Sequence, residues 1–321
     1  MRALCARATG GIDQLKVEEI PDPTPGAGQV LVSVHAAAGN PADGKVLRGE
    51  LTGRFLHAKR FPLVLGYDFA GVVEAVGEGA GDLTVGDHVY GHLPYSGKNR
   101  QGTFAEKVAV PAGEVGRLPG SVAYESAAAA ATAGLTALQG LRDRGRLTSG
   151  GRVLVLGAAG GVGTIAIGVA RKLGAAHVTA VCAAAAGDFV KDLAPDEVVV
   201  RGHGEALALD GPFDVVLDTP AAYGYVACRP MLAPRGAYVT TLPTGALVGG
   251  KLMTLLSSRR AALVVVKSAQ GDLELLGRWL AEGLKVPIDS RFRVADAGRA
   301  IDRLGQGGMR GRVVVDVAGG W

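Results

Sequence analysis

The fold is decided by the stretch Val153-Leu-Val-Leu-Gly157-Ala-Ala-Gly160-Gly161-Val-Gly163-Thr-Ile-Ala-Ile-Gly-Val-Ala-Arg171. A short apolar run, a glycine-rich turn and apolar residues at helical spacing give the order strand, loop, helix that a dinucleotide site requires. A side chain at Gly160 would block the approach of a pyrophosphate to the backbone, and Gly163 allows the helix to pack closely on the strand. The stretch predicts a nucleotide site, with a purely structural turn as the alternative.

Two sequence patterns meet near residue 120. Beyond it, apolar runs alternate with helical patterns, which is typical of βαβ units and a parallel sheet. We expect strands at 152–156, 177–181, 197–200, 213–218, 236–241, 261–266 and 312–317, and helices at 121–141, 163–173, 187–193 and 272–282. Before it, short strands punctuated by glycine, at 30–35, 71–77, 87–91 and 103–110, predict a compact β-domain or barrel.

Composition excludes several classes of protein. The length of 321 residues suggests about two domains, and the 48% apolar and 20% charged residues exclude wholesale disorder. The formal charge of +4 is mild, which argues against nucleic-acid and membrane partners. Cys5, Cys182 and Cys228 are too few for a disulfide framework or a four-thiolate zinc site. Because the N-terminus also lacks an apolar core of signal-peptide length, we expect a reducing, cytoplasmic setting.

The end of the second predicted strand bears on the choice of nucleotide. An acidic residue there binds the ribose of NAD, but Val181 is followed by Cys182 and four alanines. The missing carboxylate argues against NAD and for NADP. No lysine or arginine lies in the same stretch to meet a 2′-phosphate, so Lys191 and Arg201 are more distant candidates. Cys182 is expected to be a small buried residue and not a redox thiol.

Four segments match one family. They are residues 40–49 with Asn40-Pro41-Ala-Asp43, residues 62–77 with 86–91, residues 118–137, and the loop at 157–163. On these segments the chain resembles, over nearly its full length, the zinc-independent quinone oxidoreductases, the zeta-crystallin-like family of the medium-chain dehydrogenase/reductase superfamily. The resemblance implies an α/β protein with a GroES-like β-barrel domain (residues 1–122 and 285–321) and a doubly wound Rossmann domain (residues 123–284). The active cleft would lie between them.

The resemblance also implies an activity. Hydride would pass from NADP(H), with NAD(H) as the alternative donor, to a quinone or an α,β-unsaturated carbonyl. The substrate would be a small molecule, and by analogy the chain would form a homodimer through an edge strand at 239–241 or 262–267. Two alternatives stay open: a reductase of enoyl thioesters or biosynthetic intermediates, and a nucleotide-binding or structural protein without turnover.

One difference from the superfamily's thioester reductases argues against the thioester alternative. Thioester reductases of the superfamily carry a tyrosine just after the glycine that Gly49 matches, where this chain has Glu50. A thioester with a phosphopantetheine arm would favour a basic entrance. The local basic candidates for it are Lys59-Arg60 and Lys98-Asn-Arg100.

Metal ligands can be compared residue by residue. Zinc-dependent relatives use a catalytic cysteine, a Gly-His-Glu segment and a four-cysteine lobe. This chain has Asn40, then Gly66-Tyr67-Asp68, and no cysteine in residues 91–102. The remaining histidines have spacings that suit no zinc set, so we expect them to be paired or exposed. They are His35, His57, His88 and His92. We therefore expect no metal site and no Lewis acid in the reaction.

The catalytic candidates lie in the first two matching segments. Asn40 would donate to the substrate oxygen or order the nicotinamide ribose. Asp43 would fix the local geometry, with a helix cap as the alternative, and Tyr67 would line the cleft or pack in the core. Lys45 and Arg48 would favour an anionic product or lie exposed, and solvent would supply the product's proton.

The expected nucleotide contacts come from several segments that match the family. They are Thr136, Gly157, Ala158, Ala159, Gly160, Gly161, Val162, Gly163, Cys182, Leu242, Pro243, Thr244, Val265 and Arg312. Val265 would back the nicotinamide ring. Arg312 stands where the family often has a lysine beside the cofactor.

Overall fold

The computed structural model describes residues 1–50, 52–57, 60–202, 205, 207–254 and 257–321. The described chain forms two compact units. Unit 1 contains Met1–Thr132, Lys267–Gly283 and Ile288–Trp321, and unit 2 contains Ala133–Val266 and Leu284–Pro287. Lys59, one of the basic candidates for a thioester arm, lies outside the described residues.

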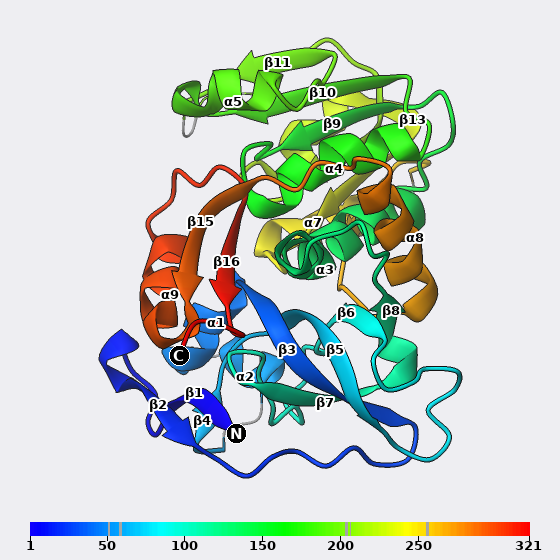
Figure 1. Cartoon of the computed structure of the whole chain (residues 1–321). Coiled ribbons are helices and arrows are strands. Elements are labelled where there is room, and N and C mark those ends of the chain that lie inside the picture. The colour runs from blue at the N-terminus through cyan, green and yellow to red at the C-terminus, as the bar shows by residue number, and fades with distance from the viewer. Residues whose placement is uncertain (51, 58–59, 203–204, 206, 255–256) are drawn as a thin grey trace. The chain divides into compact units, whose positions relative to one another are not determined.

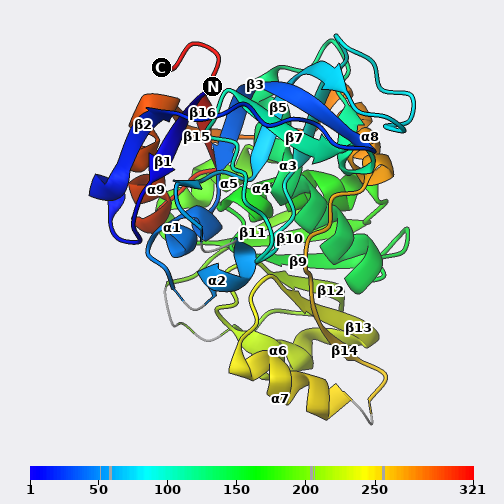
Figure 2. The same cartoon turned by 90° about the horizontal axis from the view of Figure 1, so that it is seen from below.

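Unit 2 is built on one parallel sheet of six strands. In spatial order they are β11 (Glu197–Val200), β10 (His177–Cys182), β9 (Arg152–Leu156), β12 (Phe213–Asp218), β13 (Leu232–Thr240) and β14 (Arg260–Leu263). β9, β10 and β11 lie side by side in Figure 1, and β12, β13 and β14 in Figure 2. The strand order reverses between β9 and β12, which confirms the predicted doubly wound sheet.

Apolar sequence explains why these strands and their helices pack. β9 is buried from its second residue to its last, as a strand covered on both faces must be. α4 packs on β9 and β10, and α7 packs on β14. The helices of this unit are α4 (Gly161–Lys172), α5 (Gly187–Lys191), α6 (Gly224–Cys228) and α7 (Gly245–Thr254). α3 (Tyr124–Gln139) runs from unit 1 into unit 2 and is followed by a π-helical turn (Gly140–Arg144).

The strand order decides which of the two segments proposed for dimer contact lies at the edge of the sheet. β13 lies between β12 and β14, so residues 239–241 do not form an edge, and that candidate is wrong. β14 ends the sheet and contains the start of the second candidate, 262–267. In the described part of the chain, no helix is both long enough and apolar enough to cross a membrane.

Unit 1 consists mainly of β-structure in two sheets. One sheet has the order β2 (Leu15–Glu19), β1 (Arg2–Ala6), β4 (Leu63–Val64). The other has the order β15 (Ile288–Arg293), β16 (Arg312–Asp316), β3 (Gln29–Gly39), β5 (Asp68–Val76), β6 (His88–His92), β8 (Val115–Arg117), and β7 (Lys107–Pro111) also pairs with β3. Along one side β3 pairs first with β7 and then with β16, which lets one long strand serve two parts of a curved sheet.

Short helices close unit 1 around this sheet. They are α1 (Pro41–Leu47), α2 (Gly53–Leu56), α8 (Gln270–Ala281) and α9 (Ala297–Gly305), with 3-10 turns at Ile12–Gln14, Ala112–Glu114 and Val294–Asp296. α9 packs on β15, β16 and α1. The apolar core beneath them includes Val32, Phe69, Phe104 and Val313, all fully buried.

The unit boundaries differ from the expected domain boundaries. The sequence assigned residues 123–284 to one domain, but α8 and the residues up to Thr132 belong to unit 1. Contacts with β6 and β8 hold α8 in unit 1. The Tyr90 hydroxyl on β6 donates to the Leu273 carbonyl on α8. A Cβ on Gly116 would lie only 2.5 Å from the Leu273 Cβ, so the two elements are in close contact. Helical spacing in α8 could not reveal which unit it covers.

Candidate functional site

At two positions of the loop after β9, only glycine fits. Gly157 has a φ of +75°, and a Cβ there would lie 2.6 Å from the Thr219 Oγ1. A Cβ on Gly163 would lie 2.2 Å from the Gly157 carbonyl oxygen, so α4 packs on β9 as closely as the sequence predicted. The loop after β12 thus meets the loop after β9 at the point where the strand order reverses, the position at which open α/β sheets bind ligands.

The next glycine leaves the loop open. A Cβ on Gly160 would meet only the Gly157 carbonyl oxygen, at 3.4 Å. The Gly160 N–H donates to that oxygen at 3.0 Å, and the Ala158 N–H donates to the Val181 carbonyl at 2.9 Å. The amides of Gly161, Val162 and Gly163 open α4, where no carbonyl of the helix can accept from them. Their N–H groups and the positive end of the helix dipole suit a bound anion such as a pyrophosphate.

Asp218 holds the facing loop and was missed by the sequence analysis. This fully buried carboxylate at the end of β12 accepts from the N–H groups of Ala222, Tyr223 and Gly224 and from the Tyr238 hydroxyl. Thr219 beside it donates to the Leu156 carbonyl at 2.9 Å. An aspartate that ends a predicted strand was the available signal, since such a residue can accept from the turn that follows.

Other predicted nucleotide residues gather at the same edge of the unit 2 sheet. Parallel strands all end on one side, so the segments after β9, β10, β13 and β14 lie along one edge. They carry the 157–163 loop, Cys182, Leu242-Pro243-Thr244 and Val265. Leu242 and Val265 are exposed by 37% and 54%, which suits residues available to a ligand. Thr136 is buried on α3.

Cys182, at the end of β10, is the small buried residue that the sequence predicted. Cys182 is buried, and burial raises the pKa of its thiol, which makes it a packing residue. Arg201 follows β11 directly, and its N–H donates to the Cys182 carbonyl at 3.0 Å. Its guanidinium donates to the Val200 carbonyl at 2.9 Å and is partly exposed. Lys191, the other distant candidate, is exposed and paired with Asp188 at 2.9 Å.

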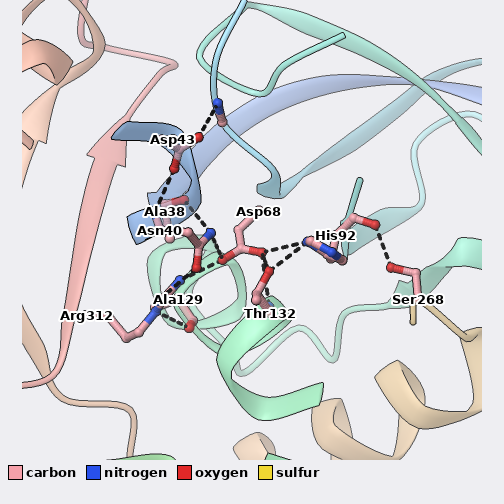
Figure 3. A network of polar contacts seen from close by, with 10 residues as sticks. Ala38, Asn40, Asp43, Asp68, His92, Ala129, Thr132, Ser268 and Arg312 are labelled. Atoms are coloured by element: carbon pink, nitrogen blue, oxygen red, sulfur yellow. Dashed lines mark hydrogen bonds and ion pairs between the residues drawn. The ribbon is translucent and has the colours of Figure 1, made fainter. Parts of the chain in front are cut away.

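A buried polar network lies in unit 1 (Figure 3). The Asn40 Nδ2 donates to the Asp68 Oδ2 at 3.0 Å and to the Ala38 carbonyl at 3.4 Å. Its Oδ1 accepts from the Arg312 Nη1 at 3.1 Å. Both amide hydrogens predicted to serve a substrate therefore already have partners within the unit. A contact from this amide to a substrate would have to replace one of them.

Arg312 is the cation of this network. Its Nη2 lies 2.6 Å from the Asp68 Oδ2 and its Nε donates to the Ala129 carbonyl at 2.9 Å. The side chain is only 4% exposed. The sequence analysis expected this residue beside the nucleotide. The structure shows Nε, Nη1 and Nη2 of the guanidinium each bonded to a group of unit 1, where its charge serves the buried Asp68 carboxylate. A contact with the nucleotide stays a prediction.

Asp43 fixes the local geometry. Its Oδ2 accepts from the Asn40 N–H at 2.7 Å and its Oδ1 accepts from the Gly66 N–H at 2.8 Å. Asn40 is the N-cap of α1 and Asp43 is its third residue, so the carboxylate reaches back to the cap instead of being the cap. Burial raises the pKa of Asp43 to about 7. One side chain thus joins α1 to the segment that carries Asp68.

Tyr67 is a core residue in this unit. It is 1% exposed, and its hydroxyl donates to the Leu56 carbonyl at 3.2 Å. Burial raises the pKa of this phenol far above its usual value, so it stays neutral. Its ring packs edge-on against Tyr95, with 4.6 Å between ring centroids. Of the two roles considered from the sequence, these contacts favour packing.

His92 completes the network, and it is paired, one of the two outcomes that the sequence analysis expected for it. It is opposite Asp68 in the β5–β6 pair, so both side chains are on one face. The Thr132 N–H donates to the Asp68 Oδ1 at 3.0 Å, and the Thr132 hydroxyl donates to the same oxygen. The His92 Nδ1 lies 2.7 Å from that hydroxyl oxygen and 3.4 Å from the carboxylate. The register of the two predicted strands was the only signal for this pairing.

The positions that bind zinc in zinc-dependent relatives do not fit a metal ion here. Asn40 and Tyr67 offer neutral groups with internal partners, and the Asp68 oxygens receive Arg312, Asn40 and Thr132. The charge that a cation would balance is already balanced by a guanidinium. In the described ranges no group of three or more histidine, cysteine, aspartate or glutamate side chains could hold a metal ion.

Comparisons with known proteins agree with this architecture. Residues 26–120 match the family described as alcohol dehydrogenase GroES-like domain, and residues 173–315 match the family described as zinc-binding dehydrogenase. A chloroplast envelope quinone oxidoreductase homologue of Arabidopsis thaliana is 31% identical and covers 96% of this chain and 95% of the relative. A trans-enoyl reductase of Aspergillus terreus is 31% identical over 92% of this chain and 88% of the relative.

A solved structure extends the likeness to three dimensions. The quinone oxidoreductase from Coxiella burnetii has a TM-score of 0.86 and 29% identity, with 99% of both chains covered. Together with the family matches, it confirms the expected fold of a GroES-like domain and a Rossmann domain.

Proposed function

Because the chain belongs to the quinone oxidoreductase-like group of the medium-chain dehydrogenase/reductase superfamily, we propose that it reduces a quinone or an α,β-unsaturated carbonyl with a nicotinamide dinucleotide and without a metal ion. The observation that carries the proposal is the loop at Gly157–Gly163. Its glycine at Gly160 leaves open space beside three amides at the start of α4. A pyrophosphate needs both features.

Different segments of unit 2 would bind different parts of the nucleotide. The α4 amides would hold the pyrophosphate, and the segments after β13 and β14 would contact the rest of the nucleotide along the carboxyl edge of the sheet. The bound nicotinamide supplies a hydride. Asp218 acts as a positioning residue, because it fixes the turn that meets Gly157.

The metal-free part of the proposal rests on unit 1. A zinc ion would need ligands that have given up their protons and are free of other partners. Asn40 and Tyr67 carry no such group, and Arg312 already pairs with Asp68 at 2.6 Å. We expect full activity after dialysis against a chelator. Loss of activity that zinc restores would contradict this part of the proposal.

We further propose that NADP(H) is preferred over NAD(H) and that Arg201 is the cation responsible. No carboxylate lies within Cys182–Ala186 to bind a ribose diol or to repel a phosphate. The backbone of Arg201 is tied to the end of β10 by its bond to the Cys182 carbonyl. An arginine that starts beside the second strand can pair with a 2′-phosphate.

Calorimetry of NADPH and NADH binding tests this preference. Because one phosphate contact is lost, Arg201→Gln should weaken NADPH binding roughly tenfold while leaving NADH binding unchanged. Arg235→Gln is the matched control, since Arg235 is an exposed arginine on β13 of the same unit. Equal loss for both nucleotides, or no loss, would reject the assignment of Arg201.

Turnover tests the activity itself. The protein is mixed with NADPH or NADH and with quinones, enones or enoyl thioesters, and the absorbance of the reduced nicotinamide is followed. We expect turnover of quinones or enones. Turnover restricted to enoyl thioesters would favour the second candidate, which the likeness to a trans-enoyl reductase supports. Nucleotide binding without turnover of any acceptor would leave a binding protein.

A further inference from the structure

The charges of unit 2 are unevenly distributed along the chain. Residues 219–266, which begin directly after β12 and include β13 and β14, contain no aspartate or glutamate. Their five basic residues are Arg229, Arg235, Lys251, Arg259 and Arg260. This one segment therefore carries more positive charge than the +4 of the whole chain. The mild total, which argued against a membrane partner, conceals a local excess.

Most of these basic residues lie where strands of the sheet begin. Parallel strands all begin at one edge of a sheet, which is opposite the edge that carries the nucleotide loop. Six arginines lie at this edge of unit 2, and we refer to them as the arginine edge. They are Arg144 and Arg146 before β9, Arg229 before β13, Arg235 within β13, and Arg259 and Arg260 at the start of β14.

Hydrogen bonds join the segments that carry these arginines. The Arg260 Nη2 donates to the Gly145 carbonyl at 3.3 Å, which brings the start of β14 to the turn before β9. The Arg259 Nε donates to the Leu232 carbonyl at 3.1 Å, which joins the same segment to the start of β13. Burial and the nearby Arg146 guanidinium lower the pKa of Arg260, so these two cations are close together.

In the described part of the chain, no ion pair links a carboxylate to any member of the arginine edge. Asp143 pairs with Arg142 at 2.6 Å, and Asp214 accepts from the Arg152 N–H at 2.8 Å. Asp210 is exposed shortly before β12. The exposed members of the arginine edge are Arg144, Arg146, Arg229 and Arg235. An exposed guanidinium without a carboxylate partner can pair with a phosphate of another molecule.

The two helices that end at the arginine edge also expose apolar side chains. α6 and α7 lead into β13 and β14, and they pack against each other, as Figure 2 shows. Their exposed apolar residues are Val226, Val248, Leu252 and Met253, which are 45% to 66% exposed. Lys251 is the one charged residue of α7. Exposed apolar side chains gathered on neighbouring helices indicate a surface that binds a partner.

We propose that the arginine edge, together with the exposed apolar residues of α6 and α7, binds the surface of a membrane that contains anionic lipids. The lipid phosphates would pair with the arginines, and the apolar side chains would enter the boundary between headgroups and acyl chains. RNA or an acidic peptide would match the charge and leave the apolar side chains uncovered. A second copy would cover the apolar side chains but would place the same acid-free segment against itself.

This surface and the nucleotide loop lie at opposite edges of one sheet, so both can be occupied together. The inference goes beyond the proposed function and does not depend on it, because binding to vesicles requires neither nucleotide nor turnover. If vesicle binding fails while the protein reduces an acceptor, only this inference fails. If both are observed, the enzyme is held at the phase in which an apolar quinone concentrates.

Cosedimentation with lipid vesicles tests the proposal. We expect the protein to bind vesicles of phosphatidylcholine and phosphatidylglycerol in equal parts, and to bind phosphatidylcholine alone far more weakly. Added salt should weaken binding to the mixed vesicles, because it screens the lipid charge. Equal binding to both kinds of vesicle, or binding to neither, would overturn the proposal. Binding to an RNA oligonucleotide or an acidic peptide but to neither kind of vesicle would assign the surface to another partner.

A triple variant tests the arginine edge. Arg144→Gln, Arg146→Gln and Arg235→Gln together should weaken binding to the mixed vesicles roughly a hundredfold, since each arginine near such a surface contributes about fivefold. The matched control removes the same charge from three exposed arginines of unit 1. They are Arg100, Arg278 and Arg299, each changed to glutamine. Equal losses for the two variants would show that only total charge matters and would overturn the assignment.

A single variant tests the apolar part of the surface. Leu252→Ser should weaken binding to the mixed vesicles roughly tenfold, because one apolar side chain is lost from the lipid contact. Val85→Ser is the control, since Val85 is a residue of unit 1 with the same 66% exposure, and it should bind as the wild type does. Sedimentation velocity identifies a second copy as the partner instead. If Leu252→Ser turns a dimer into a monomer and leaves vesicle binding unchanged, the proposal fails.

Discussion

The glycine loop of unit 2 and the polar network of unit 1 are specified in opposite ways. The loop is one continuous segment, and its geometry depends on backbone conformation and on missing side chains at Gly157, Gly160 and Gly163. The network consists of side chains far apart in the sequence, from Asn40 to Arg312, each held by a charged or hydrogen-bonded partner. The first can be recognised from spacing, whereas the second appears only when the chain is folded.

The two regions should therefore fail differently when changed. A substitution at Gly160 should remove ligand binding and spare the fold, because a Cβ there meets only one atom, at 3.4 Å. A substitution in the network should lower stability first, because each member balances another. The following variants test this contrast, from the largest expected effect to the smallest.

Arg312→Met should produce the largest loss of stability. It leaves the Asp68 carboxylate buried without a cation, and breaking a buried pair in this way costs about 3–5 kcal/mol of unfolding free energy. Urea unfolding measures it. Arg291→Met is the control, since its pair with Glu125 at 2.8 Å is exposed and should contribute at most about 1 kcal/mol. Similar losses for both variants would show that Arg312 is no more critical than a surface residue.

Gly160→Asp should abolish nucleotide binding while keeping the fold. The new side chain enters open space, where a Cβ meets only one atom at 3.4 Å, and it brings a negative charge to a phosphate site. We expect affinity to fall by roughly a hundredfold or more, about 2.7 kcal/mol. Calorimetry measures affinity, and thermal unfolding should shift only slightly. Gly160→Ala is the milder control, and unchanged binding by the aspartate variant would refute the loop assignment.

Asp43 should make stability depend on pH in an unusual direction. Its pKa is raised by burial to about 7 from an ordinary value of 3.8, so the folded state holds a proton that the unfolded state has lost between these values. Its contribution is therefore complete at acidic pH and declines as pH rises toward about 7. Asp43→Asn should flatten this part of the curve of unfolding free energy against pH. An unchanged slope would show that Asp43 does not titrate there.

Tyr67→Phe should have the smallest effect. The hydroxyl makes one hydrogen bond, to the Leu56 carbonyl, and its loss should cost about 0.5–1.5 kcal/mol. Since the ring stays in the core, kcat for quinone reduction should remain within about twofold. A large fall in kcat without a matching loss of stability would return Tyr67 to the catalytic candidates.

The fold was largely readable from the sequence where structure is local. β9, α4, β10 and β12 lie within a residue or two of the positions expected from apolar runs and helical spacing. Several elements were missed. The strands β1, β2 and β15 are short, and five or six residues carry little periodicity. The helix α9 has a clear amphipathic pattern that the sequence analysis did not use. The strand expected at 103–110 begins only at Lys107.

The candidate site likewise has one part that local sequence spacing predicts and one part that it does not. The glycine roles follow from spacing, and the structure gives Gly163 the close contact expected of it. Asp68, His92 and Thr132 come together only through the pairing of β5 with β6 and the approach of α3, which no local pattern encodes. Arg312 was assigned to the nucleotide by resemblance, and nothing nearby in the sequence reveals that Asp68 is its partner.

The cation at the centre of unit 1 is part of the polypeptide. A guanidinium keeps its charge throughout the range in which proteins are folded, and neither dilution nor competition from another ion can remove it. The charge balance of this region is therefore complete as soon as the chain has folded.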